Sequence, residues 1–145
     1  MVSEALASLP DWTRRMLAEA RVGHLGLVDD HDRPRVLPVT FALHEGFLWS
    51  AIDAKPKRRR PARLRYLARR PRAALTVDRY AEDWSTLAWV QVLCAVEILD
   101  AARAPAALAA LAAKYEQYRD VPPPGPVLRL EPDRALCWHA AGDRI

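Results

Sequence analysis

The chain carries one concentrated positive charge, in the segment from Lys55 to Arg72. Ten of these eighteen residues are Lys or Arg, and none is acidic. The other 127 residues hold 12 basic and 18 acidic residues, so they sum to −6 although the whole chain is +4. A localised positive field on an acidic body suits the binding of a polyanion, whether a phosphate, a polycarboxylate or a nucleic acid. We therefore take this basic segment, residues 55–72, as the first candidate functional region.

Sequence patterns for other common catalytic or metal chemistry do not occur. The chain has no G-x-S-x-G nucleophile elbow, no H-E-x-x-H zinc motif, no phosphate loop and no dinucleotide-binding G-x-G-x-x-G. The four histidines show no metal-ligand spacing, so we predict no metal site. This pattern is compatible with a redox protein, in which a cofactor carries the hydride chemistry and the protein supplies position, electrostatics and exclusion of water.

Length and composition indicate a single globular domain, residues 1–145. The chain is 51% hydrophobic and 28% charged, which is ordinary for a globular protein. It has no apolar run of about 18 residues and no basic, apolar leader, so we expect a cytoplasmic protein without membrane contact. Cys94 and Cys137 lie in separate apolar segments without a C-x-x-C or Cys/His ligand pattern. We therefore favour two buried, reduced thiols over a disulfide.

Hydrophobic period and turn residues predict a mainly β chain with short helices. An amphipathic helix follows Ser8-Leu9-Pro10, and further helices are expected over about 61–70 and 105–118. The predicted strands are 24–28, 35–43, 47–52, 73–77, 87–99 and 127–138. We expect the first three strands to form a meander, with Pro38 at a sheet edge or a bulge because it cannot donate to a ladder. Six antiparallel strands of this kind favour a small barrel, since closure removes unpaired sheet edges.

The order of these motifs resembles a known family. The pattern comprises Pro38-Val-Thr-Phe-Ala-Leu43, then Asp53-Ala-Lys-Pro-Lys-Arg58, then Arg63-Leu-Arg-Tyr-Leu67 and Pro71-Arg-Ala-Ala-Leu-Thr-Val77. It is similar to the pyridoxamine 5'-phosphate oxidase-like (PPOX class) superfamily of split β-barrel flavoproteins, over about residues 10–140. The stretch from Val77 to Trp84, followed by Leu87-Ala-Trp-Val90, looks most like the branch that uses the deazaflavin coenzyme F420. The resemblance implies a homodimeric, six-stranded antiparallel split β-barrel of the FMN-binding type.

The same resemblance assigns anion contacts to the start of the basic segment. Lys55 and Lys57 match family positions that hold the cofactor phosphate. Arg58 would extend the positive path toward the glutamate tail of F420, because guanidinium groups pair well with carboxylates. A solvated, charged turn is the simpler interpretation of such a run, but the isolation of this positive field favours ligand binding.

Contacts to the ring and polyol of the cofactor fall on two neighbouring predicted strands. The family places them at Pro38, Val39, Thr40, Trp49 and Ser50. Thr40 and Ser50 can offer hydroxyl groups to a polar cofactor edge. For Val39 and Trp49 a core position and a cofactor wall are equally compatible with the sequence.

These residues lead us to expect an F420-dependent oxidoreductase that transfers hydride between the deazaflavin and a small unsaturated or quinone-like substrate. An FMN-dependent flavoprotein of the same fold is the alternative, although Arg58, Arg59 and Arg60 exceed what one phosphate needs. A non-catalytic cofactor carrier also remains open. A nucleic-acid-binding module is disfavoured, since the rest of the chain is acidic and shows no helix-turn-helix, zinc-finger or RNP-like pattern. Trp84 and Trp89 supply large apolar surfaces that a homodimer would cover.

Overall fold

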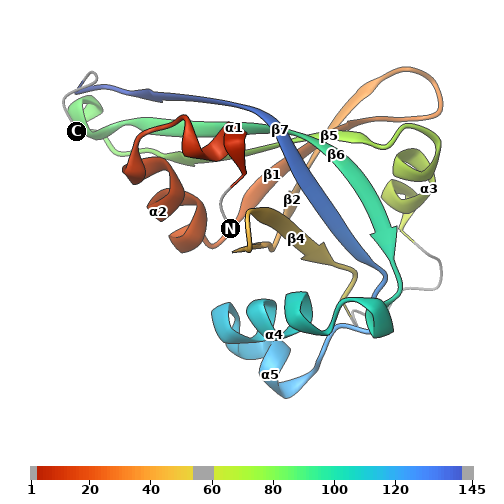
Figure 1. Ribbon diagram of the computed structural model, residues 1–145. Helices are drawn as coiled ribbons and strands as arrows, with labels where there is room; N and C mark the ends of the chain where they lie inside the picture. Colours follow the sequence, from red (N-terminus) through yellow and green to blue (C-terminus); the bar gives the residue numbers. More distant parts are fainter. Residues whose placement is uncertain (1–2, 54–60, 142–145) are drawn as a thin grey trace.

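The computed structural model describes residues 3–53 and 61–141, and this part is mainly β, as predicted. One antiparallel sheet of seven strands curls around the main hydrophobic core (Figure 1). The strands are β1 (Gly23–Val28), β2 (Pro34–Val39), β3 (Ala42–His44), β4 (Phe47–Ala51), β5 (Arg72–Arg79), β6 (Ala88–Leu99) and β7 (Val127–His139). The helices are α1 (Glu4–Ala7), α2 (Asp11–Glu19), α3 (Ala62–Arg69), α4 (Pro105–Lys114) and α5 (Glu116–Asp120), with 3-10 turns η1 (Trp84–Thr86) and η2 (Ala101–Arg103).

The strand order corrects the predicted meander. Neighbouring strands follow the order β2-β1-β5-β6-β7-β4-β3, so β2 and β3 lie at opposite edges of the sheet. The single strand expected over residues 35–43 is interrupted at Thr40 and Phe41, which gives seven strands rather than six. The interruption lets the Phe41 side chain turn into the core, where it is fully buried. We call Thr40–Phe41 the crossing segment, because it carries the chain from one edge to the other. The edge position expected for Pro38 is confirmed.

The long strands build the core through their alternating side chains. In β6, Val90, Val92, Cys94 and Val96 are buried, while the residues that alternate with them are more exposed. The β6–β7 register shifts between Leu93 and Cys94, where Pro132 enters the ladder of β7. A bulge is where a proline is tolerated inside a sheet, because a ladder hydrogen bond is already missing there.

Helices cover the inner side and the open end of the curled sheet. Trp12 and Leu17 of α2 pack into the core, as do Leu64 and Leu67 of α3. The spacing of three residues places Leu64 and Leu67 on one face of their helix. No helix in the described part is long and apolar enough to cross a membrane.

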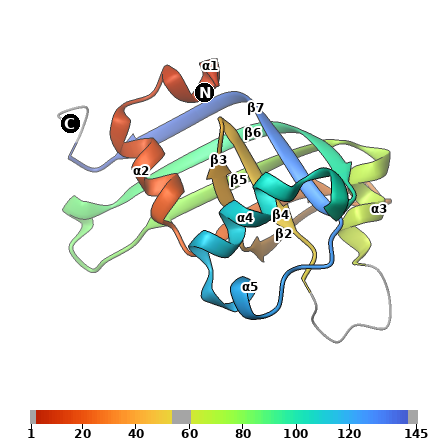
Figure 2. The same cartoon turned by 60° about the horizontal axis from the view of Figure 1, so that its bottom comes forward.

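The helix pair α4–α5 forms a second, smaller cluster against β3 and β4. Leu111, Tyr115 and Tyr118 are buried there against Ala42 and Ala51. Figure 2 shows the pair in front of these two strands, on the side opposite the outer face of β5 and β6. The helix predicted over 105–118 is therefore two helices, which meet at Tyr115.

The two cysteines lie on adjacent strands. Cys94 is buried and Cys137 is half-buried. Burial raises the pKa of the Cys94 thiol to about 12, so this thiol stays protonated at neutral pH.

Candidate functional site

A cavity of about 380 Å³ opens beside the crossing segment. Its described lining residues come from β2, the crossing segment, β4, α3 and the ends of neighbouring loops, and are Val22, Leu37, Pro38, Val39, Thr40, Ser50, Ala51, Asp53 and Arg63. The apolar members lie mostly on and beside the β1–β2 hairpin, and the charged members lie after β4 and on α3. We call this space the crossing cavity. One apolar wall with a few convergent polar groups is the usual make-up of a small-molecule site.

Side-chain hydroxyls hold the crossing segment in place. The Ser50 hydroxyl donates to the Thr40 carbonyl at 2.7 Å, and the Thr40 hydroxyl lies 2.6 Å from the Tyr118 hydroxyl. The Tyr115 hydroxyl accepts from the Phe41 amide at 3.1 Å and donates to the Arg21 carbonyl at 2.9 Å. A chain that leaves one sheet edge for another loses its ladder partners, so these hydroxyls satisfy backbone groups that would otherwise be buried and unpaired.

Arg63 is the cation that the described residues place in the crossing cavity. It lies one residue before Leu64 and four before Leu67, so its stem follows the inward side of α3 while its head reaches the cavity. The Nε atom is buried and has no hydrogen-bond partner within the described chain. Burial lowers the pKa of the guanidinium, and the neighbouring Asp53 and Tyr118 oppose that shift. Arginine nevertheless stays charged at neutral pH.

An anionic ligand fits this arrangement. A buried N–H without an acceptor is costly, and a phosphate or carboxylate oxygen would complete its hydrogen bonding. Asp53 disfavours an anionic ligand, because its carboxylate already stabilises the Arg63 charge. Firm binding of an anion therefore calls for more cations than Arg63 alone. In the sequence, further cations of the basic segment follow shortly after Asp53.

One protein family matches nearly the whole chain. The family described as "Pyridoxamine 5'-phosphate oxidase" matches residues 9–139. The chain belongs to this family. No curated protein sequence matches the chain significantly.

Solved structures with the same fold are named for different ligands. A FAD-binding protein from Mesorhizobium loti superposes with a TM-score of 0.66 at 18% identity, covering 89% of this chain and 94% of that one. An "F420 Reductase" gives 0.64 at 20%, covering 88% and 98%. HutZ, a heme storage protein from Vibrio cholerae, gives 0.64 at 15%, covering 96% and 95%. At these identities the likeness establishes the split-barrel fold and leaves the cofactor to the residues of the site.

The family member described here brings most of its predicted strand residues to one place. Pro38, Val39, Thr40 and Ser50 all line the crossing cavity, with Val39 also part of the core. Trp49 points to the opposite side of β4, where its indole donates to the His44 carbonyl at 3.2 Å and its ring packs on the α4–α5 cluster. The period-two alternation of a strand separates it from Ser50.

The three basic residues predicted to bind the phosphate and tail, Lys55, Lys57 and Arg58, lie outside the described residues. Their role stays a prediction. The described residues on either side of that stretch, Asp53 and Arg63, both line the crossing cavity.

Sequence analysis missed Arg63, Tyr115 and Tyr118. Arg63 is one of ten cations in the basic segment, and its spacing from Leu67, which puts it beside the inward stripe, is what sets it apart. The two tyrosines follow Leu111 at helical spacing. Amphipathic side chains on the inward stripe of an alanine-rich helix were the available signal, since such tyrosines usually find a polar partner when buried.

A larger cavity, of about 650 Å³, lies between α1, the β3–β4 turn and the bulged part of β7. Four acidic residues and one basic residue line it, namely Glu4, Glu45, Glu131, Asp133 and Arg134. We call it the acidic cavity. Its charge is the reverse of what a phosphate-bearing ligand needs.

Proposed function

We propose that the protein is an F420-dependent oxidoreductase, which binds the deazaflavin in the crossing cavity and reacts with a small unsaturated or quinone-like substrate. The observation that carries the proposal is the buried Nε of Arg63, which has no acceptor in the described chain and belongs to a residue lining a cavity edged by hydroxyl groups. Family membership supports redox chemistry on a cofactor, and one structural neighbour is named an F420 reductase.

Each side of the cavity has a separate task in this proposal. Arg63 holds an anionic group of the cofactor, and Lys55, Lys57 and Arg58 extend the positive field toward its glutamate tail. Leu37 and Val39 provide an apolar wall that keeps water from the reacting atoms. When bound, the deazaflavin supplies hydride from its C5 carbon.

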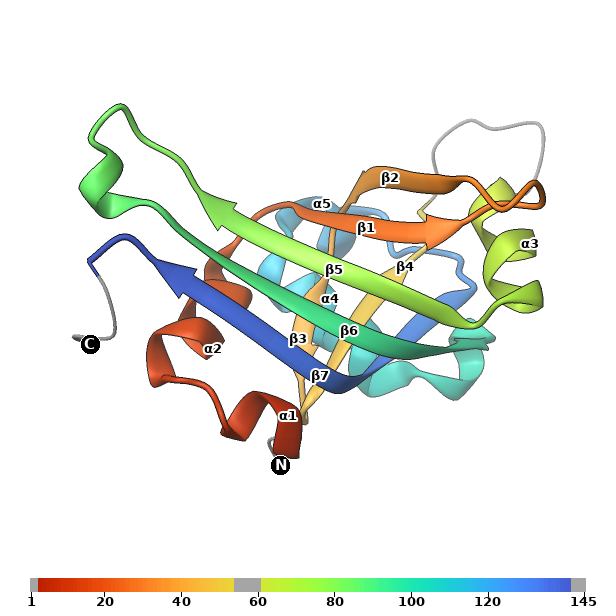
Figure 3. The same cartoon turned by 90° about the horizontal axis from the view of Figure 1, so that it is seen from above.

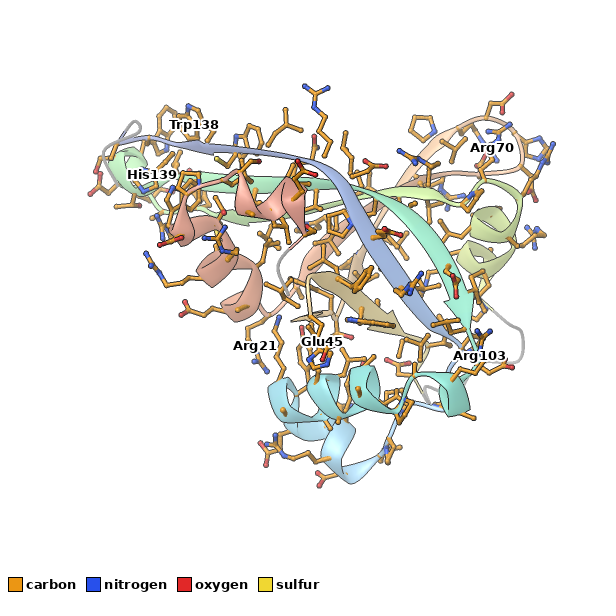
Figure 4. The ribbon with its side chains drawn as sticks, viewed as in Figure 1. Arg21, Glu45, Arg70, Arg103, Trp138 and His139 are labelled. Carbon is orange, nitrogen blue, oxygen red and sulfur yellow. The ribbon has the colours of Figure 1, made fainter. Side chains whose placement is uncertain are left out.

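A homodimer belongs to the same proposal, because one face of the sheet carries exposed apolar side chains, among polar ones, and is not covered by a helix. Trp89 and Trp138 are directly opposite each other on β6 and β7 and are 36% and 46% exposed. Figure 3 looks onto this face, where no helix lies in front of β1, β5 and β6, and Figure 4 places Trp138 on it. Val36 on β2 is 71% exposed and borders a shallow hollow of about 480 Å³ on the same face. Exposed apolar patches of this kind mark interaction surfaces.

The position of this face relative to the crossing cavity favours a site shared between two subunits. His24 borders the outer hollow, while its register partner Pro38 lines the crossing cavity. A second subunit seated on the outer face would therefore lie beside the cavity. We expect a stable dimer that buries at least about 2,000 Å². Sedimentation that gives a monomer at micromolar concentration, with full cofactor affinity, would rule out a shared site.

The deciding experiment is a parallel titration of purified protein with F420, FMN and haem. FMN is the main alternative cofactor, and haem is included because HutZ, with the same fold, is a heme storage protein. We expect F420 to bind at least about tenfold more tightly than FMN, or about 1.4 kcal/mol, because the basic segment engages the glutamate tail as well as the phosphate. Equal affinities would remove the argument for F420, and preferential haem binding would replace the proposal.

A carrier function is separated from an enzyme by turnover. Protein loaded with reduced F420 should oxidise it when a quinone is added, at a rate above that of free coenzyme. Tight binding without any such acceleration across quinones and activated alkenes would favour the carrier.

A further inference from the structure

The contact between the Thr40 and Tyr118 hydroxyls joins the crossing cavity to the helix pair α4–α5. Their oxygens are 2.6 Å apart although the residues are 78 positions apart in sequence. Tyr118 is 6% exposed, whereas Thr40 is half-buried and lines the cavity. Only one of the two hydroxyl hydrogens can lie in this contact, so the direction of donation decides what Thr40 offers to a ligand.

Hydrogen-bond accounting favours Tyr118 as the donor. A phenol is more acidic than an aliphatic alcohol and is the stronger donor of the two. The Tyr118 hydroxyl makes no other hydrogen bond within the described residues, so donation by Thr40 would leave a buried phenolic hydrogen without an acceptor. Donation by Tyr118 leaves the Thr40 hydrogen free to meet a group in the cavity.

The surroundings of Tyr118 strengthen the same direction. The phenol interacts electrostatically with Arg63, the cation of the cavity. A nearby positive charge polarises the O–H bond and makes it a better donor. Ser50 and Tyr115 hold the backbone of the crossing segment by separate hydrogen bonds, so the position of the Thr40 Cα does not depend on Tyr118.

We propose that Tyr118 is a positioning residue, which orients the Thr40 hydroxyl as a hydrogen-bond donor to an acceptor oxygen of the ligand in the crossing cavity. The inference rests on the proposed function, since it takes the cofactor to be that ligand. Tyr118 acts only through Thr40 and does not touch the cofactor. It follows that α4–α5, which supplies no lining residue among those described, still adjusts the affinity of the site.

A double-mutant cycle on cofactor affinity tests this coupling. The variants are Thr40→Val, Tyr118→Phe and the double variant, and F420 affinity is measured by quenching of its fluorescence. Thr40→Val should weaken binding by about tenfold, as expected for loss of one hydrogen bond to an ionic or strongly polar group. Tyr118→Phe should weaken it several-fold, and the double variant should be no weaker than Thr40→Val alone.

Three comparisons separate positioning from a structural role. Thr40→Ser keeps the hydroxyl and should retain near wild-type affinity. Tyr66→Phe makes the same chemical change on α3, away from the cavity lining, and should leave affinity unchanged. Thermal unfolding gives the coupling between positions 40 and 118 in stability. This coupling should be no larger than their coupling in the free energy of cofactor binding.

The outcomes distinguish the two proposals. If wild-type protein binds neither F420 nor FMN, the proposed function is overturned and this inference with it. If wild type binds but Tyr118→Phe matches it, or if the two single losses add in the double variant, Tyr118 does not act through Thr40 and only this inference is overturned.

Discussion

The crossing cavity and the acidic cavity differ in size and in charge, and the two properties point in opposite directions. The acidic cavity is larger, at about 650 Å³ against about 380 Å³. The crossing cavity holds Arg63, whose buried Nε lacks an acceptor in the described chain. Volume alone would select the acidic cavity, although its carboxylates repel the anionic cofactor that we propose for this chain.

What distinguishes the smaller cavity is unused hydrogen-bonding capacity. Its walls contain a donor that folding has left without a partner in the described chain, and hydroxyl groups held at fixed positions by neighbouring strands and helices. A pre-organised group binds a ligand without a further ordering cost. For an anionic ligand, the sign of the charge and the unpaired donors of a cavity therefore matter more than its volume.

The largest expected effect comes from removing the charges of two lysines that follow Asp53, a lining residue of the crossing cavity, in sequence. With Lys55 and Lys57 both replaced by Ala, cofactor affinity should fall by about two orders of magnitude or more, because each lost charge-assisted contact costs about 1.5–3 kcal/mol. The melting temperature should barely change if these lysines contribute little to folding. Fluorescence titration and thermal unfolding measure the two quantities.

The same double variant also tests a nonspecific electrostatic surface. Eight cations of the basic segment remain in it. A general polyanion-binding patch would lose only part of its affinity for DNA, with the salt slope reduced by about two. We expect no retention of wild type on DNA near about 150 mM salt. Unchanged cofactor binding would show that Lys55 and Lys57 are only a solvated turn.

A single substitution compares the two cavities directly. Arg63→Met keeps much of the buried stem but removes the charge and the unpaired donor, so cofactor affinity should fall by about tenfold or more. Arg134→Met makes the same change in the lining of the acidic cavity and should leave affinity unaltered. If the Arg134 variant shows the larger loss, the cofactor binds in the acidic cavity and the comparison is reversed.

Salt should produce a smaller effect, of several-fold, on the wild-type protein. Exposed ion pairs weaken as the Debye length falls from about 10 Å at 0.1 M toward 3 Å at 1 M. We expect F420 affinity to decrease steadily between about 50 and 500 mM NaCl. Affinity that is independent of salt would assign the binding energy to ring contacts with the apolar wall.

The smallest effect concerns the helix pair α4–α5. The Lys114 ammonium is buried without an acceptor in the described chain and lies 4.0 Å from the centroid of the Phe41 ring. Burial lowers its pKa to about 8, and Arg21 adds to the shift. Between about pH 8 and 10.4, the unfolded chain therefore binds a proton that the folded chain does not, so the free energy of unfolding rises with pH in this window.

Urea unfolding at about pH 7.5 and 9.5, on either side of the folded-state pKa, measures this contribution as a difference between wild type and Lys114→Met. The wild type should gain stability relative to the variant at the higher pH. The Cys94 thiol has the opposite slope, because its pKa is raised and the unfolded chain loses this proton first. That contribution is common to both proteins and cancels. Parallel pH profiles would contradict the burial of the Lys114 charge.

The parts of the fold with a strong local signal were predictable from sequence. The alternation in β6 and the leucine spacing in α3 occur where expected, because packing against one core rewards a regular period. Pro38 marked the edge strand because it lacks an N–H. The seventh strand was missed because residues 35–43 read as one β run, and α1 was missed because it has only four residues.

The candidate site was predictable only in part, for a related reason. Pro38, Val39, Thr40 and Ser50 meet because their strands are joined through the crossing segment, and the family resemblance already carried that arrangement. Arg63 and Tyr118 belong to residue types that are common on surfaces. Helical spacing places both beside an inward stripe, but it does not indicate which groups their polar atoms meet. The partner of each is set by the path of the chain and not by its neighbours in sequence.

The two-residue crossing segment also bears on the order in which the molecule folds. The β1–β2 and β3–β4 hairpins are local and can form early, yet they lie at opposite edges of a sheet whose intervening strands, β5, β6 and β7, come later in the chain. The relative placement of β2 and β3 is therefore settled only when long-range pairing is complete, which is the slow, entropically costly part of folding a β protein. The crossing segment is then among the last regions to reach its native conformation. A ligand bound there would stabilise contacts that form late in folding. It would therefore slow unfolding and leave the folding rate nearly unchanged.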